Sequence, residues 1–305
     1  MAKPREIKRR LRSLGKTRQI TKTMELVATS KMKKTQERVT AARPFAQKLA
    51  EILASLDVAT LGAKFPLLSP REKVKRVAIV AITSNRGLAG ALNANVIRTT
   101  KQQVAGAEER GASVDLHAFG KKGIAAFRYA GYTMKSTSAD LTDKPDFRIA
   151  ERFGGEMIRA FLDGEIDEVR LVFPAFRSLV SQPPTVEVLL PLAEKVKEVV
   201  AAAVAKRAAS GAGAAVASAP PDFLLEPSPE EILDALLPLL VKNAIYRVFL
   251  EAAASEQAAR RVAMKNATDN AEDLIRLLTR QYNRARQAQI TQEIAEIVGG
   301  ADALK

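Results

Sequence analysis

The sequence predicts a fold of class α plus α/β, in which helices at the two ends of the chain form an antiparallel coiled coil around an inserted α/β domain. Three observations predict it. The first 48 residues are strongly basic with apolar residues at helical spacing, the middle alternates short apolar runs with helical stretches, and residues 239–298 contain neither Pro nor Gly. At 305 residues the chain is long enough for roughly two domains.

The N-terminal segment, residues 1–58, is predicted to be the first helix of the coiled coil. Its first 48 residues contain 15 Lys and Arg residues and only three acidic residues, so nearly all of the formal net charge of +14 lies in this segment. Arg18 and Thr21 interrupt the apolar stripe, so the helix suits pairing with one other helix. Pro44 should kink the helix or end it. The residues of the stripe are Ile7, Leu11, Leu14, Ile20, Met24 and Val27.

Residues 73–192 are predicted to fold as a Rossmann-like α/β domain. Four stretches are short, mostly apolar and bounded by turn residues, as expected of strands in a sheet covered on both faces. Helical stretches lie between them, and this alternation is typical of an α/β layer structure. The predicted strands are 74–83, 114–119, 169–173 and 186–190, and the helices include 91–107 and 149–162.

The last part of the chain is predicted to hold an Ala-rich linker or insertion, 193–222, and the second helix of the coiled coil, 223–305. The first half of the linker favours helix, and residues 210–221 are expected to be mobile. Ser228 is a plausible helix cap, with Glu231 three residues on, and Pro238 should kink the helix. The sixty residues after Pro238 would span roughly 90 Å, so this helix needs a partner or a sleeve. Its expected seam is Ala259, Ala263, Ala267, Ala271, Leu274 and Leu278, followed by Ile290, Ile294 and Ile297.

The composition excludes several kinds of chemistry. With no cysteine, the chain cannot form a disulfide, a thiolate metal site or a cysteine nucleophile, and His117 is its single histidine. A lone histidine within a strand is expected to be a packed or a surface residue, not a catalytic one. The longest apolar runs, 77–82 and 199–205, are far shorter than the roughly 20 residues that span a bilayer. We expect no cofactor, no metal site and a soluble chain whose basic N-terminal segment is mature structure.

Two features leave other functions open. The Gly-rich turn at 84–93 follows a strand and opens a helix, but Gly87 and Gly90 do not make a dinucleotide fingerprint, so tight packing is favoured over nucleotide binding. The basic helix has the charge density of a nucleic-acid binder, yet Phe45 is its only aromatic residue and no recognition motif is present. The turn at 120–123 is expected to be a solvated turn.

Two long motifs, one near each end of the chain, point to a particular protein family. Residues 7–34 (IKRRLRSLGKTRQITKTMELVATSKMKK) and 254–300 (ASEQAARRVAMKNATDNAEDLIRLLTRQYNRARQAQITQEIAEIVGG) strongly resemble the γ subunit of F-type ATP synthases of the bacterial type. Residues 82–93 (ITSNRGLAGALN), 181–192 and 226–227 fall between them in the order of that family. The resemblance covers essentially the whole chain.

The resemblance implies a non-catalytic rotor subunit of the central stalk. Its partners would be the α and β subunits of the catalytic head, the ε subunit and the ring of c subunits, and it would bind no nucleic acid. Proton flow would turn the c ring and this chain with it, which couples hydrogen ion transport to ATP synthesis. The chain would be peripheral, at the cytoplasmic face of the bacterial inner membrane, and would reach the membrane only through the complex.

The resemblance also implies roles for particular residues. Leu225 and Glu226 would contact the c ring. An apolar bearing inside the sleeve of α and β subunits would consist of Ile290, Ile294, Ile297 and Val298. The residues expected to contact the catch and the lever of the β subunit are Lys22, Met24, Lys31, Arg284, Arg286, Gln287, Thr291 and Glu293. The alternatives are a basic helical nucleic-acid-binding protein and an α/β nucleotide-binding enzyme that uses the Gly87–Gly90 turn.

Overall fold

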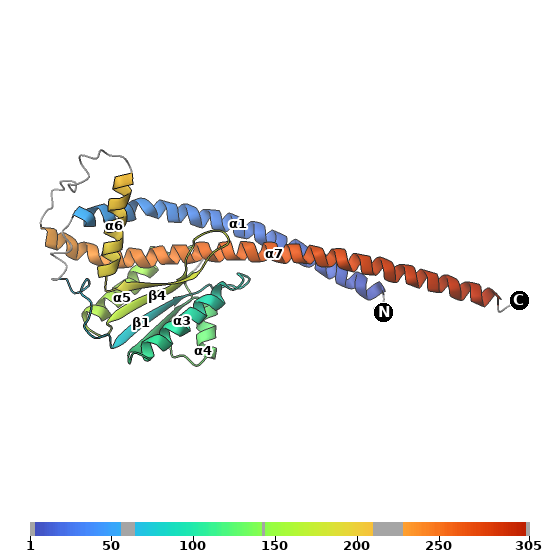
Figure 1. Ribbon diagram of the computed structural model, residues 1–305, viewed down its shortest axis with the longest axis horizontal. Helices are drawn as coiled ribbons and strands as arrows, with labels where there is room; N and C mark the ends of the chain where they lie inside the picture. The colour runs from blue at the N-terminus through green and yellow to red at the C-terminus, as the bar shows by residue number, and fades with distance from the viewer. Residues whose placement is uncertain (1–3, 56–64, 142–143, 210–227, 303–305) are drawn as a thin grey trace. The chain divides into compact units, whose positions relative to one another are not determined.

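The computed structural model describes residues 4–55, 65–141, 144–209 and 228–302 (Figure 1). By compactness the chain divides into two units, and the two ends of the chain lie in the same unit. One unit consists of residues 1–30 and 260–305, and the other of residues 31–259. Leu225, Glu226 and the expected mobile stretch 210–221 lie outside the described residues.

Two long helices, α1 (Pro4–Ser55) and α7 (Pro229–Asp302), contribute to both units. Ser228 caps α7, because its hydroxyl accepts a hydrogen bond from the backbone N–H of Glu231 at 3.2 Å. Pro44 was expected either to kink the first helix or to end it, and the second expectation is wrong because α1 continues through this residue. Leu49 and Leu53, which follow it, are buried, and this packing offsets the backbone hydrogen bond that proline removes.

In the unit formed by residues 1–30 and 260–305, the two helices pack as an antiparallel pair (Figure 1). The hydroxyl oxygens of Thr21 and Thr268 lie 2.8 Å apart, and a guanidinium nitrogen of Arg18 lies 4.0 Å from a carboxylate oxygen of Glu272. The two seams alternate spacings of four and three, the 3.5-residue repeat of a left-handed coiled coil. The least exposed positions on α1 include Ile7, Leu11, Leu14, Thr21 and Ala28, and those on α7 are Met264, Thr268, Ala271, Ile275, Leu278, Tyr282 and Ala285.

The expected alanine seam at every fourth residue is therefore only partly right. Ala271 and Leu278 lie in the observed seam, but Leu274 leaves 47% of its surface exposed. Four residues of an α-helix turn through about 400°, so a line with that spacing drifts away from a straight partner. Alternating steps of four and three keep one face toward α1.

The unit of residues 31–259 contains a five-stranded sheet with the order β3-β2-β1-β4-β5. The pairs β1·β2, β1·β4 and β2·β3 are parallel, and β5 at the edge runs antiparallel to β4. The strands are β1 (Arg76–Ile82), β2 (Ser113–Phe119), β3 (Ser136–Ser138), β4 (Glu168–Pro174) and β5 (Pro184–Leu190). The shorter helices are α3 (Leu92–Glu108), α4 (Lys121–Tyr129), α5 (Phe147–Leu162) and α6 (Ala193–Ala209).

Alternate residues of the strands point to opposite faces, so the sheet builds two apolar cores. On one face, Val77 and Ile79 pack with side chains of α3 and α4, such as Val96 and Phe127. The other core joins the sheet to α5 and to the first part of α7, and also takes in the C-terminal part of α1. This arrangement gives the expected α/β layers and makes the long helix α7 part of the domain core (Figure 1).

Two elements were missed by the sequence analysis. Residues 120–123 do not form a solvated turn, because α4 begins at Lys121 and Gly123 is buried within it. A Cβ atom at Gly123 would lie 2.7 Å from the hydroxyl oxygen of Thr83, so only glycine lets the helix approach the end of β1 this closely. Strand β3 has only three residues, all Ser or Thr, and shows no apolar pattern.

Candidate functional sites along the C-terminal helix

The last turns of α7 extend beyond the seam. From Arg286 to Gly299 every residue is exposed, whereas the seam positions up to Ala285 are at least partly covered. Positions 289, 292 and 296 would continue the seam, but they hold the polar residues Gln289, Gln292 and Glu296. The side-chain amide of Gln292 donates a hydrogen bond to the carboxylate of Glu296 at 2.9 Å. The coiled-coil pattern therefore ends where α7 no longer has α1 to cover.

The predicted bearing residues form a separate apolar stripe on this part of α7. Ile290, Ile294, Ile297 and Val298 leave 46%, 56%, 72% and 55% of their surfaces exposed. Ile290 and Ile297 each lie one residue beyond a position that continues the seam, and Ile294 lies two residues from its nearest such positions, so the expectation that the seam runs through these isoleucines is wrong. On an α-helix one residue corresponds to a rotation of about 100°, so this stripe faces away from the α1 side of the helix.

The predicted polar contact residues of α7 occupy two faces of the same turns. Arg284, Gln287 and Thr291 follow spacings of three and four and share one face, and all three are exposed. Arg286 and Glu293, seven residues apart, share another face. The carboxylate of Glu293 accepts a hydrogen bond from the Gln289 amide at 2.8 Å. The structure thus brings these five residues together at one end of α7, on the same exposed turns as the apolar stripe.

The predicted contact residues of α1 are Lys22, Met24 and Lys31. Lys22 is exposed and forms an ion pair with Glu25 at 3.2 Å, and Met24 is half-buried. Lys31 is half-buried and belongs to the other compact unit. The same part of α1 exposes 59% of Ile20, so apolar and basic side chains mix on its surface.

The Gly-rich turn uses its polar groups for its own structure. The Asn93 carboxamide oxygen accepts a hydrogen bond from the Ser84 backbone N–H at 3.0 Å. The Asn85 amide donates to the carbonyl oxygens of Ala139 and Leu141 at 2.8 and 2.6 Å, and its oxygen accepts from the Lys121 backbone N–H. These bonds close the turn onto its neighbours, which is the tight packing that the sequence favoured over a phosphate-binding loop.

His117 is a packed residue of β2. Its side chain contacts the Phe153 ring edge-on, and its Nδ1 atom lies 2.7 Å from the Ser136 hydroxyl oxygen. Burial lowers the pKa of His117 to about 4; Asp115 opposes this shift and Lys135 adds to it. The imidazole is therefore neutral at physiological pH. Of the packed and the surface residue expected from the sequence, the packed one is confirmed.

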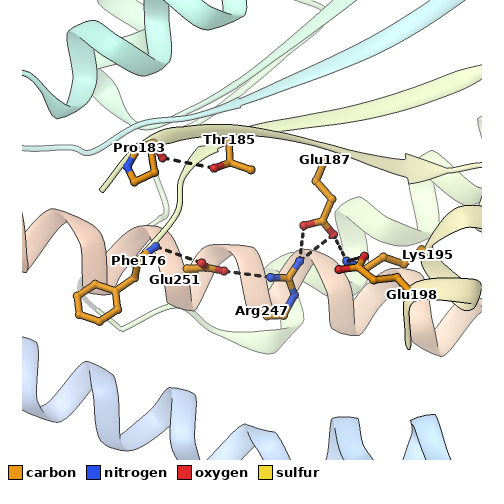
Figure 2. Close-up of polar contacts among 8 residues, drawn as sticks. All are labelled: Phe176, Pro183, Thr185, Glu187, Lys195, Glu198, Arg247 and Glu251. Carbon is orange, nitrogen blue, oxygen red and sulfur yellow. Dashed lines mark hydrogen bonds and ion pairs between the residues drawn. The ribbon is translucent and has the colours of Figure 1, made fainter. Parts of the chain in front are cut away.

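A polar network at the edge of the sheet was missed by the sequence analysis (Figure 2). The carboxylate of Glu187 on β5 accepts hydrogen bonds from Arg247 on α7 at 2.5 and 2.7 Å and pairs with Lys195 on α6 at 2.5 Å. Arg247 also donates to Glu251 at 3.0 Å, and Glu251 accepts a hydrogen bond from the backbone N–H of Phe176 at 3.1 Å. We call these five residues the Arg247 network.

Glu187 and Arg247 of the network are held in the ionised form by their neighbours. Burial by itself raises the pKa of Glu187, but Arg247 and Lys195 outweigh burial, and the pKa lies below its ordinary value. Burial likewise opposes the charged form of Arg247, but Glu187 and Glu251 raise the pKa of Arg247 above its ordinary value. Both shifts favour the charged forms, so Glu187 and Arg247 form an ion pair.

Two properties of the described residues bear on membranes and metals. Across the described ranges, no helix is both long and apolar enough to cross a bilayer. Within the same parts of the chain, His, Asp and Glu side chains nowhere gather in a group of three that could hold a metal ion.

Comparisons with known proteins agree over the whole length of the chain. A family model described as ATP synthase matches residues 3–304. The chain is 46% identical over 305 residues to the ATP synthase gamma chain of Gemmatimonas aurantiaca and 40% identical over 304 residues to that of Leptospira biflexa, with 100% of each chain covered.

Solved structures show the same fold. A chain of the Tetrahymena thermophila mitochondrial ATP synthase central stalk and c-ring matches with a TM-score of 0.56 and 25% identity, over 81% of this chain and 99% of that one. A chain of the Euglena gracilis mitochondrial ATP synthase matches with a TM-score of 0.65 and 22% identity, over 99% of this chain and 94% of that one. The comparisons support neither the nucleic-acid binder nor the nucleotide enzyme. The chain belongs to the family of ATP synthase gamma chains.

Proposed function

We propose that this chain is the central-stalk rotor subunit of a proton-translocating ATP synthase, and that it transmits torque between a c ring and a catalytic head of α and β subunits. The single observation that carries the proposal is the full-length match to ATP synthase gamma chains at 46% identity. The fold matches to chains described as central stalk and rotor support it.

The exposed end of α7 is suited to turning inside a sleeve. A bearing needs apolar side chains that gain from being covered but make no directional bonds, because directional bonds would hold one angle. Ile290, Ile294, Ile297 and Val298 meet this need, since they are exposed in the chain and face away from α1. We assign this stripe to the apolar lining of the α and β subunits.

The polar residues beside the stripe are suited to signalling the angle of the rotor. A rotor changes the conformation of a β subunit only if it binds the conformations of that subunit unequally. Arg284, Gln287 and Thr291 lie on one side of the helix, so they reach different β subunits at different angles. We assign them, with Arg286 and Glu293 and with Lys22, Met24 and Lys31 of α1, to contacts with the β subunits.

The chain has a mechanical role, and the α and β subunits carry out the chemistry. This assignment is supported by the engagement of the candidate chemical groups in packing, namely the Gly-rich turn and His117. The remaining partners are an ε subunit and the c ring, which Leu225 and Glu226 would contact. Through that ring the chain lies at the cytoplasmic face of the bacterial inner membrane.

Reconstitution tests the proposal. The full-length chain is combined with all the other head, stalk, stator and membrane subunits of the ATP synthase of the same bacterium in vesicles, and ATP hydrolysis and ATP-driven acidification are measured. The expected result is a stable complex that acidifies the vesicles, and that fails to do so when the chain is left out. A chain that forms no complex, or a complex that hydrolyses ATP and pumps equally well without it, would contradict the proposal.

A further inference from the structure

We propose that the Arg247 network is the joint that carries torsional load between the α/β domain and α7. The inference rests on the proposed function, because only a rotor transmits torque. It concerns the unit of residues 31–259, in which the sheet, α6 and the first part of α7 lie together.

Apolar packing attaches α7 to the sheet but does not fix its angle. Leu237, Val241, Ile245 and Phe249 of α7 are buried in the same core as the strands and α5. The hydrophobic effect is proportional to the area covered and has no preferred direction. Such a contact resists separation of the two layers, and it resists sliding or twisting only through the fit of the side chains.

The Arg247 network supplies directional contacts at this interface. Arg247 donates through Nη2 to both carboxylate oxygens of Glu187, and through Nη1 to Glu251. Charge-assisted hydrogen bonds of a guanidinium depend on its planar geometry, so they weaken when the two elements rotate against each other. The side chains of Glu187 and Lys195 are only 17% and 14% exposed, which limits screening of the carboxylate by water, whereas the Arg247 side chain is 42% exposed.

The network ties the edge of the sheet to α7 at two points (Figure 2). One tie joins Glu187, within β5, to Arg247, and the other joins the backbone N–H of Phe176, just after β4, to Glu251. Strands β4 and β5 are paired neighbours, and Arg247 and Glu251 are one helical turn apart. Two separated ties oppose a twist that a single tie would allow.

Helix α6 braces the first of these ties. Lys195 pairs with Glu187 at 2.5 Å and also with Glu198 at 3.4 Å. Lys195 is thus a second cation on the Glu187 carboxylate, and it holds that carboxylate in its orientation toward Arg247. Glu187 and Glu251 balance the charges of Arg247 and Lys195, which leaves no net charge among these four groups.

The chain offers a matched control pair on the same helix. Lys242 of α7 pairs with Glu151 of α5 at 3.4 Å, so this pair also links α7 to the α/β domain. It makes a single contact, and its side chains are 26% and 52% exposed. An ion pair of this kind contributes little to stability and holds no fixed geometry.

The experiment uses the assembled complex with Arg247→Met, Arg247→Lys, Glu187→Gln and the control Lys242→Met. The readouts are the rate of ATP hydrolysis, vesicle acidification per ATP hydrolysed, and the angular fluctuation of the α/β domain in single molecules whose α7 tip is held in a stalled head. Arg247→Met removes the stronger of the two ties, so its angular variance should increase at least about twofold. Arg247→Lys should give an angular variance between those of the parent and Arg247→Met. The control Lys242→Met should give the same angular variance as the parent.

Acidification per ATP should fall in the same order as the variance rises, while hydrolysis and assembly stay unchanged. Parental variance and coupling in Arg247→Met would overturn the joint. If Arg247→Met does not assemble, the angular variances of Arg247→Lys and Glu187→Gln test the joint instead. A variance equal to that of the parent in both variants would overturn the joint. If the parental complex itself does not couple, the proposed function fails and not the joint alone.

Discussion

Replacing the apolar stripe at the end of α7 should weaken binding to the α and β subunits without weakening the chain itself. The change is Ile290→Ser, Ile294→Ser and Ile297→Ser in one variant. These side chains are 46%, 56% and 72% exposed, so most of the free energy of burying them is still available to a partner. Full burial of an isoleucine is worth about 1.5–3 kcal/mol, so the exposed parts together retain about 4 kcal/mol. The affinity should therefore fall about a thousandfold.

The assay is a binding titration of the full-length chain with the head of α and β subunits, in parallel with thermal unfolding of the chain alone. The control variant carries Gln289→Ser, Gln292→Ser and Glu296→Ser, which change the same turns of α7 on the face that continues the seam. The control should bind within about threefold of the parent, because exposed polar substitutions change little. Equal losses in both variants, or none in the isoleucine variant, would refute the assignment of the stripe.

Three further substitutions or conditions test other parts of the structure. Because burial holds the pKa of His117 at about 4, below the value of about 6.5 in the unfolded chain, the unfolded state binds a proton first as the pH falls. The free energy of unfolding of the α/β domain should thus decrease by about 2 kcal/mol from pH 7 to pH 5, and a variant His117→Gln should lose this dependence in exchange-detected urea titrations. Gly120→Ala should destabilise the domain by about 3 kcal/mol, because position 120 has a φ of +92° and the new Cβ would lie 2.1 Å from the Thr83 carbonyl oxygen. The control Gly111→Ala should cost about 1 kcal/mol, because position 111 has a φ of +77° but open space around it. Equal melting temperatures of the two variants would contradict this prediction. Met24→Lys adds a cation to the basic surface of α1, so it should impair coupling of the complex more than its assembly, and unchanged coupling would argue against Met24 as a contact of the β subunit.

The elements that the sequence predicts best are those with a strong local pattern. The sixty residues after Pro238 contain no helix breaker, and they lie within a single helix, α7. The mostly apolar runs around 77–82 and 169–173 became β1 and β4, because a strand covered on both faces needs apolar residues at most of its positions.

The features that the sequence did not predict depend on contacts between distant residues. The need for glycine at position 123 appears only when Thr83 is placed against it. The Arg247 network joins Glu187, Lys195 and Arg247, which are separated by up to 60 residues and show no common spacing. The true seam of α7 was missed for a related reason, because Thr268 is polar and its place is defined by Thr21 on the other helix.

The candidate site shows the same division. The apolar stripe and the polar residues near it were predicted as a set, because they lie within fifteen residues of one helix. The structure adds their orientation, since only the observed seam shows that Ile290, Ile294 and Ile297 face away from α1. Whether they contact the α and β subunits is a property of the complex, and no pattern within one chain determines it.

Rotation of a single molecule tests the central claim most directly. The chain has no cysteine, so Tyr129→Cys, at a side chain that is 95% exposed at the end of α4, creates a unique attachment point on the α/β domain. A bead is attached there, and a complex of this chain with α and β subunits is fixed to a surface through its β subunits. We expect the bead to rotate in one direction while ATP is hydrolysed, and to stop when ATP is removed. ATP hydrolysis at the normal rate with a bead that only fluctuates about a fixed angle would contradict the rotor.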